Sequence, residues 1–153
     1  MRRLLLIPLL LLACRHAPPR PVVILISIDT LRSDHLPAYG YRAIRTPAID
    51  RLAADGIVFE HAYAHVPMTL PSHATIMTGE LPPANGVRDN AGFRLDPKTP
   101  TIASILRANG YATAAAVSAY VLRRETGINN GFDFYDDHPL PRRRARRQPA
   151  TRR

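Results

Sequence analysis

The sequence predicts an α/β fold with a mainly parallel sheet, and three patterns along the chain support this prediction. An apolar run at residues 22–28 has the length and β-branched composition of a strand buried on both faces. Two segments, residues 46–56 and 99–110, begin with Thr-Pro and end with Gly, as capped helices do. Short strand-like stretches follow both helices, at residues 57–59 and 111–118.

Composition limits the chain to one globular domain with charged ends. The 153 residues are 46% hydrophobic and 22% charged, with a net charge of +9. Residues 1–20 hold four Arg and residues 139–153 hold seven, without any acid, whereas residues 21–138 hold ten Lys and Arg against all twelve acids. Because the middle of the chain is slightly acidic, nucleic acid is not expected as a partner of the domain.

The N-terminal sequence indicates an export signal. Arg2 and Arg3 precede an apolar run, residues 4–12, that is too short to span a bilayer and suits a cleaved signal peptide. The residues Leu11-Leu12-Ala13-Cys14 resemble a bacterial lipobox, which predicts lipidation of Cys14, a membrane anchor and an outer-membrane or periplasm-facing location. The alternative is an ordinary secretory signal with an incidental Cys. A lone Cys excludes intramolecular disulfides.

The domain boundaries follow from these ends. We expect a signal peptide and tether at residues 1–20, the folded domain at residues 21–138, and a disordered Arg-rich tail at residues 139–153.

Within the domain, each element has a local signal. Asp29 directly follows the first apolar run, at the strand end where open α/β sheets bind ligands. Apolar residues at helical spacing mark one face of each predicted helix: Ile49, Leu52 and Ala53 in the first, and Ile102, Ile105 and Leu106 in the second.

A third predicted helix carries most of the chemistry. Pro71 and Ser72 suit a helix start and Gly79 suits its end, so Thr69 would lie just ahead of the N-terminus. The unpaired N–H groups and positive dipole end there form a site for a phosphate or sulfate oxyanion. The alternative is that Thr69 merely caps the helix.

Several ordered blocks together resemble the N-terminal half of the sulfatase family, within the alkaline phosphatase superfamily. These blocks are residues 23–36, 39–41, 46–53, 59–63, 69–79, 85–90 and 131–136. The resemblance implies an alkaline-phosphatase-like α/β/α sandwich hydrolase, of which the chain covers the N-terminal half only. It also implies that metal ions and a nucleophile at a helix start cleave sulfate or phosphate esters.

The resemblance assigns two residues directly. Asp29 matches a metal-binding acid, although Ile28 stands where the family often has a second acid. Thr69 matches the nucleophile position, where sulfatases have a Cys or Ser, within C/S-x-P-x-R, that is oxidised to formylglycine. In this chain the five residues are Thr69-Leu70-Pro71-Ser72-His73, so His73 replaces the Arg. The implied cofactor is a divalent ion such as calcium, zinc or manganese.

The substitution by Thr shifts the expected substrate from sulfate toward phosphate esters, because a metal-held alkoxide attacks phosphorus directly. His73 would bond a ligand oxygen or cap the helix start. Arg88 and Asn90 would bind the anionic group, or belong to a turn stapled by Asp89 and Asn90.

Other candidates are expected to be structural. His61 and His65 follow a strand signal rather than lying on a helix. The acids and histidine at residues 133–138 alternate with aromatic residues, as in a packed loop.

The family pattern stops after Asp137, and no Asp-His-Gly stretch supplies the remaining metal ligands. We therefore expect a truncation or a shifted reading frame, with a functional basic tail as the alternative, and no turnover by this chain alone. Three functions remain open: a sulfatase-family metallohydrolase, a catalytically incompetent ester-binding or scaffold lipoprotein, and an electrostatic module that uses its Arg tail.

Overall fold

The computed structural model of the chain describes residues 20–138. The predicted lipidation site Cys14 and the Arg-rich segment at residues 139–153 lie outside the described residues. The chain divides into two compact units, Met1–Leu31 and Arg32–Arg153. In the described part of the chain, no helix is long and apolar enough to cross a membrane.

The first unit contributes residues 20–31, and these form neither a helix nor a strand. The predicted strand at residues 22–28 is therefore wrong: its large apolar side chains are exposed, from 84% for Val22 to 53% for Ile28. A strand needs a neighbour that completes its backbone hydrogen bonds, and no strand among the described residues pairs with this segment. The apolar pattern indicates a high strand propensity, but it does not specify a neighbouring strand with which the segment could pair.

The second unit begins with two 3₁₀ turns, η1 (Ser33–His35) and η2 (Pro37–Tyr39), followed by the helix α1 (Pro47–Asp55). The predicted start and end of this helix are confirmed, with Pro at its first position and Gly56 directly after it. The Thr46 hydroxyl donates to the Asp50 carboxylate at 2.9 Å instead of capping a backbone amide.

The helix α1 buries none of its residues. Leu52, on its predicted apolar face, is 66% exposed, and α1 contacts η2. The predicted strand at residues 57–59 is wrong as well, since these residues are exposed and lack strand pairing. The Tyr39 hydroxyl donates to the Phe59 carbonyl at 3.0 Å and so ties this segment to η2.

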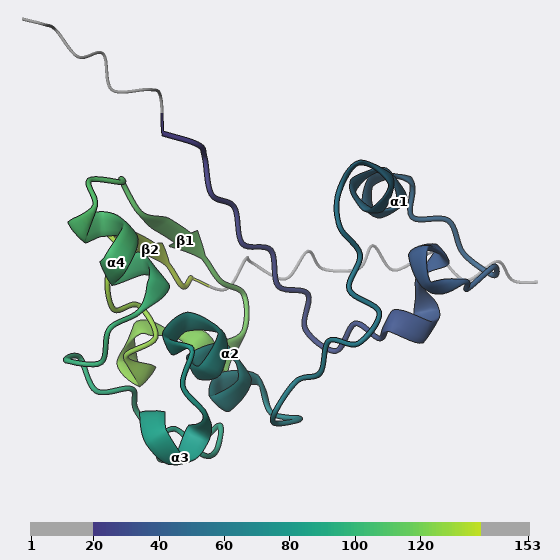
Figure 1. Cartoon of the computed structure of the whole chain (residues 1–153). Coiled ribbons are helices and arrows are strands. Elements are labelled where there is room, and N and C mark those ends of the chain that lie inside the picture. Colours follow the sequence, from purple (N-terminus) through teal and green to yellow (C-terminus); the bar gives the residue numbers. More distant parts are fainter. Residues whose placement is uncertain (1–19, 139–153) are drawn as a thin grey trace, which may run out of the picture. The chain divides into compact units, whose positions relative to one another are not determined.

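The rest of the second unit holds the packed core. Its elements, whose helices and strands are labelled in Figure 1, are α2 (Thr69–Thr78), α3 (Pro82–Asn85), α4 (Ile102–Ala108), β1 (Ala114–Ala116), η3 (Tyr120–Leu122), η4 (Arg124–Thr126) and β2 (Phe134–Asp136). The strands β1 and β2 pair in parallel, with Ala115 opposite Tyr135. Helices combined with a small parallel sheet are the part of the predicted α/β class that the structure contains.

The helix α2 begins two residues earlier than Pro71 and Ser72 suggested. Its first residue is Thr69, so Pro71 lies in the first turn, where a missing N–H costs no helical hydrogen bond. Gly79 ends the helix in a left-handed conformation, as predicted, and its N–H donates to the Thr75 carbonyl at 2.8 Å.

One face of α2 forms the centre of the core. Leu70, Ala74 and Met77 follow helical spacing and are buried, with Leu70 and Ala74 at 0% exposure. They belong to a cluster that also contains Val87, Leu95, Ala103, Leu122, Ile128 and Tyr135. Complete burial of a Leu or Val side chain contributes roughly 1.5–3 kcal/mol, so this cluster dominates the stability of the described residues.

The helix α4 packs through its small residues. Thr101 and Ser104 form a reciprocal capping box, so the cap is Thr101 rather than the predicted Thr99. Ala103 is buried, whereas Ile102 and Ile105 of the predicted apolar face are exposed. Gly131 approaches the backbone of α4 closely, and a β-carbon added there would clash with Ser104 and Ala103. A residue larger than glycine therefore does not fit at position 131 beside this part of the helix.

Two carboxylates, Asp133 and Asp137, connect the segment around β2 to earlier parts of the chain. Asp133 accepts hydrogen bonds from the Thr113 N–H at 2.9 Å and from its hydroxyl at 3.0 Å, and these bonds lower the pKa of Asp133. Asp137 accepts from the Arg124 N–H at 2.9 Å and pairs with its guanidinium at 3.3 Å, which lowers the pKa of Asp137. Both acids therefore have the structural role that their aromatic neighbours predicted.

Candidate functional site

The predicted nucleophile, Thr69, is half-buried at the first position of α2. The preceding residue, Met68, has an extended backbone and offers no side-chain cap to the first turn. The first N–H groups of a helix have no partner within the helix, so they must bind another group. At this end of α2 the partner comes from a distant loop.

That partner is Asn90. Its side-chain oxygen accepts a hydrogen bond from the Leu70 N–H at 2.8 Å. The loop that carries Asn90 is anchored beside α3: Asn85 donates to the Glu80 carbonyl at 2.7 Å and accepts from the Val87 N–H at 2.9 Å, and Val87 is fully buried. The fold therefore brings Thr69 and Asn90 to the same helix end, although Asn90 is 20 residues from Leu70.

His73 lies one turn after Thr69 on the same helix. Its Nδ1 is 2.7 Å from the Thr69 carbonyl oxygen. A carbonyl oxygen can only accept, so Nδ1 carries the proton and donates it. This bond is neither of the two sequence-based alternatives, a bond to a ligand oxygen or a cap at the helix start. His73 instead contacts the backbone carbonyl of Thr69.

The remaining residue of the predicted anion-binding group is Arg88. It is exposed and lies on the same loop as Asn90. The Asp89 carboxylate accepts from the Ala91 N–H at 3.3 Å, so part of the predicted stapled turn is present. Asn90 does not staple this turn; its side-chain oxygen accepts a hydrogen bond from the N-terminal end of α2 instead.

The predicted metal ligand, Asp29, lies in the first unit and is exposed. Thr30, directly after it, has a φ of +57°, which is strained for a β-branched residue. Divalent cations such as Ca²⁺ take several oxygen ligands, and the described residues contain no group of three or more His, Cys, Asp or Glu that would hold a metal ion. These residues therefore do not amount to a complete metal site.

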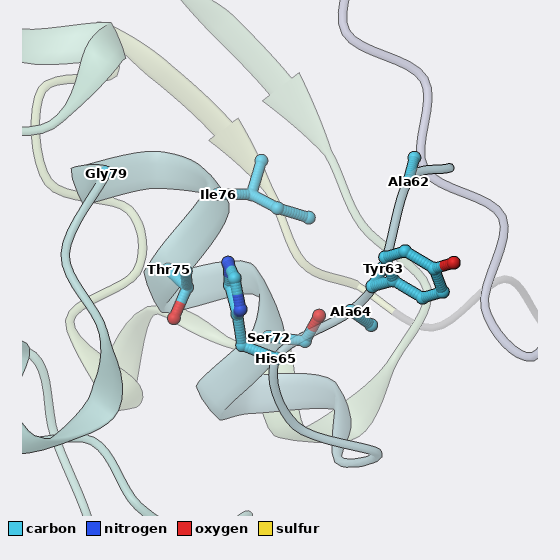
Figure 2. A pocket seen from close by; sticks show the side chains of 8 residues that line it. All are labelled: Ala62, Tyr63, Ala64, His65, Ser72, Thr75, Ile76 and Gly79. Carbon is cyan, nitrogen blue, oxygen red and sulfur yellow. The ribbon is translucent and has the colours of Figure 1, made fainter. Parts of the chain in front are cut away.

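A cleft of about 500 Å³ runs along a different face of α2. Residues 62–65 line one side of it, and Ser72, Thr75, Ile76 and Gly79 line the other (Figure 2). The Thr75 hydroxyl is buried and has no hydrogen-bond partner among the described residues. Sequence reasoning missed this cleft, although the helical spacing of its α2 residues was a usable signal.

The cleft and the predicted site do not coincide. Thr69, His73, Arg88 and Asn90 are not among the residues that line it. His65, predicted to be structural, does line it, and His61 interacts instead with the Tyr63 hydroxyl at 3.5 Å. The N-terminal end of α2, with Thr69 and Asn90, and the cleft along the side of α2 are therefore two different parts of the surface of this helix.

These observations define an α/β protein in which a helix that packs in the core presents a hydroxyl residue at its first position. A family model described as Sulfatase matches residues 21–151. The chain belongs to the sulfatase family, a family of hydrolases, and the resemblance found in the sequence is confirmed.

Similar proteins cover the chain well but extend far beyond it. The chain is 35% identical over 108 residues to steryl-sulfatase of Mus musculus, a match that covers 64% of this chain and 17% of the relative. It is 33% identical over 112 residues to N-acetylglucosamine-6-O-sulfatase of Bacteroides thetaiotaomicron, covering 72% and 20%. The chain thus spans about a fifth of the length of these curated relatives.

A solved structure agrees with the sequence comparisons. A 2-O GAG sulfatase matches with a TM-score of 0.58 and 29% identity, over 69% of this chain and 23% of that structure. The described fold therefore corresponds to the N-terminal region of sulfatases.

Proposed function

We propose that this chain carries the nucleophile portion of a sulfatase-family ester hydrolase whose substrate is a sulfate or phosphate monoester or diester. The observation that supports this most is the position of Thr69 at the first residue of α2, in register with the family's nucleophile motif. An anionic ester group at this helix end is stabilised by the positive end of the helix dipole. The proposal places this region in an α/β/α sandwich of the alkaline phosphatase type.

Threonine favours phosphate over sulfate in this proposal. The formylglycine of sulfatases derives from Cys or Ser, and Thr69 is neither. In the proposed reaction the Thr69 hydroxyl loses its proton and its oxygen forms a bond to phosphorus while the bond from phosphorus to the ester oxygen breaks, and that oxygen takes up a proton as the alcohol leaves. Water then attacks phosphorus, which releases phosphate and restores the Thr69 hydroxyl. Arg88, exposed on the neighbouring loop, would bind the non-bridging oxygens in bidentate fashion.

The proposed cofactor is a divalent ion, as is typical of the family. We assign Asp29 as one ligand; the described residues contain no group of three or more His, Cys, Asp or Glu that would complete the ligand set. A chain that offers a single carboxylate should bind the ion weakly, so we expect no ester hydrolysis by the 153-residue chain alone.

The experiment compares aryl phosphate and aryl sulfate hydrolysis by a longer polypeptide that adds a C-terminal sulfatase portion to this chain. Thr69→Ala should abolish turnover, whereas Ser72→Ala, three residues further along α2, should keep most of it. Full activity of Thr69→Ala would disprove the nucleophile assignment. Metal-dependent hydrolysis by the 153-residue chain would disprove its incompetence.

A second candidate function is an ester-binding lipoprotein without turnover, which the single predicted carboxylate ligand favours. It predicts that the longer polypeptide binds an aryl phosphate in a titration but releases no alcohol. Both candidates share the proposed export and anchoring through Cys14. Cys14→Ser should then release the protein from the detergent phase, and a soluble wild-type protein cleaved elsewhere would contradict the anchor.

A further inference from the structure

The peptide group that joins Thr69 to Leu70 is held at both of its polar ends by side chains. Its N–H donates to the Asn90 side-chain oxygen at 2.8 Å, and its C=O accepts from Nδ1 of His73 at 2.7 Å. The two side chains come from different parts of the sequence, one from the loop after α3 and one from α2 itself. Such a double hold fixes the plane of this one peptide group.

The hydrogen bond to Asn90 takes the place of a side-chain N-cap, which α2 lacks. The residue before α2 supplies no side-chain acceptor, so Asn90 performs for the first turn the task of an N-cap residue. Because Val87 is fully buried and Asn85 bonds the chain on both sides of α3, the loop is fixed to the core. The position of the α2 N-terminus is thereby tied to the core rather than to its own local sequence.

The hydrogen bond from His73 to the Thr69 carbonyl depends on the tautomer of the imidazole ring. Donation to the Thr69 carbonyl requires the proton on Nδ1, so any further proton that the ring takes up goes to Nε2. His73 stands where the family motif has Arg. An imidazole at this position can reach back one turn and bond the carbonyl of the nucleophile residue itself.

We propose that His73 and Asn90 are positioning residues for Thr69 rather than substrate ligands. This inference rests on the proposed function of Thr69 as the nucleophile. The held peptide group sets ψ of Thr69 and φ of Leu70, and with them the direction from which the hydroxyl approaches an ester. Nucleophile placement matters because an error of about 1 Å can reduce a rate by roughly 100-fold.

The first test reads the histidine ring in the 153-residue chain by ¹⁵N NMR at a pH where His73 is neutral. The proposal predicts a signal of Nδ1–H type for His73, with Nε2 unprotonated. The opposite tautomer, with the proton on Nε2, would overturn the role of His73. His65 and His138 in the same spectrum serve as internal references.

The second test measures hydrogen exchange of the Leu70 amide in two matched variants. Asn90→Asp keeps an oxygen acceptor at the same place, whereas Asn90→Leu keeps the size and removes the acceptor. We expect Asn90→Asp to retain the protection of Leu70, and Asn90→Leu to speed its exchange roughly tenfold. The Leu95 amide, which donates to the Thr126 carbonyl at 2.9 Å, is the control for the core.

The outcomes separate the possibilities. Unchanged Leu70 exchange in Asn90→Leu, or loss of protection in Asn90→Asp while Leu95 stays protected, would overturn the role of Asn90. If Asn90→Leu unfolds the core, Leu95 exchanges faster too, and the Asn90→Asp result then decides. None of these measurements uses ester hydrolysis. A negative result for ester hydrolysis would therefore count against the proposed function without changing the hydrogen-bond results for His73 and Asn90.

Discussion

The helices α1 and α4 are flanked by nearly the same residues, yet only α4 packs in the core. Thr46-Pro47 precedes α1 and Gly56 follows it, while Thr99-Pro100 precedes α4 and Gly110 follows it. The helix α4 buries Ala103 against the core, whereas α1 buries nothing. Local sequence signals therefore indicate where a helix lies, whereas the burial of its side chains depends on which residues of the rest of the chain pack against it.

The same contrast extends to the segments around these helices. Residues 32–66, here called the open segment, contain one buried large apolar residue, Leu36, and leave Ile57 84% exposed. Residues 69–137, here called the core segment, contain the whole buried cluster. The core segment also carries Thr69, His73 and Asn90, so the best-packed part of the described chain is the part that supports the proposed site.

The largest expected effect comes from two glycines with similar backbone angles. Gly131, in the core segment, has a φ of +90°, and a β-carbon there would lie 2.1 Å from the Ser104 nitrogen. Gly40, in the open segment, has a φ of +96°, and a β-carbon there meets nothing within 4 Å. Gly40→Ala should cost only the backbone strain, roughly 1–2 kcal/mol, whereas Gly131→Ala should cost more and separate β2 from α4. Urea unfolding of both variants checks this, and equal losses would contradict the packing at Gly131.

The next effect concerns leucine truncation. Leu70→Ala removes a fully buried side chain and should lower the free energy of unfolding by about 2–5 kcal/mol. Leu52→Ala removes a side chain that is 66% exposed and should change it by no more than about 0.5 kcal/mol. The two variants are measured by the same denaturation curves. A large loss for Leu52→Ala would show that the open segment is packed in solution.

A smaller effect is expected at the helix caps. Thr101→Ala breaks the capping box of α4 and its bond to the Asn130 carbonyl, so it should cost about 1 kcal/mol. Thr46→Ala removes a hydroxyl that binds only the Asp50 carboxylate, so its cost should be smaller. The order of the two thermal midpoints is the measurement, and the reverse order would contradict the assigned caps.

The smallest effect is the response to acid. The pKa of Asp137 is held below its usual range by the Arg124 N–H and guanidinium, so its contribution to stability is present above the unfolded value of about 3.9 and is lost as the pH falls through the lower folded value. Asp137→Asn should therefore reduce the loss of stability on acidification. Asp34→Asn is the control, because Asp34 pairs with Arg32 on the surface and exposed pairs contribute little. An equal effect of the two variants would contradict the structural role of Asp137.

How much of this was predictable from the sequence differs between helices and strands. The start of α1 at Pro47, the end of α2 at Gly79 and the centre of β1 followed from local signals. The run at residues 22–28 did not become a strand, because strand formation depends on a partner that a local pattern cannot specify. The exposed Ile105 illustrates the same limit, since apolar residues at helical spacing do not specify which face of α4 meets the core.

The candidate site shows a similar division. Thr69 was located by its register relative to Pro71 and Gly79, and the structure places it at the start of α2. The bond between Leu70 and Asn90 was not predictable, because no periodicity links residues 20 positions apart across a loop. His73 was expected near a ligand or a cap, and its bond to the Thr69 carbonyl depends on a ring orientation that composition does not determine.

Residue-by-residue hydrogen exchange on the 153-residue chain tests most directly that the packed core lies in the core segment, which also carries Thr69 at the start of α2. We expect slow exchange for the Leu95, Ile105 and Val117 amides, whose carbonyl partners lie within the core segment, and fast exchange across residues 57–59. Equal protection of the open and core segments would contradict this packing, as would fast exchange at Leu95 and Val117.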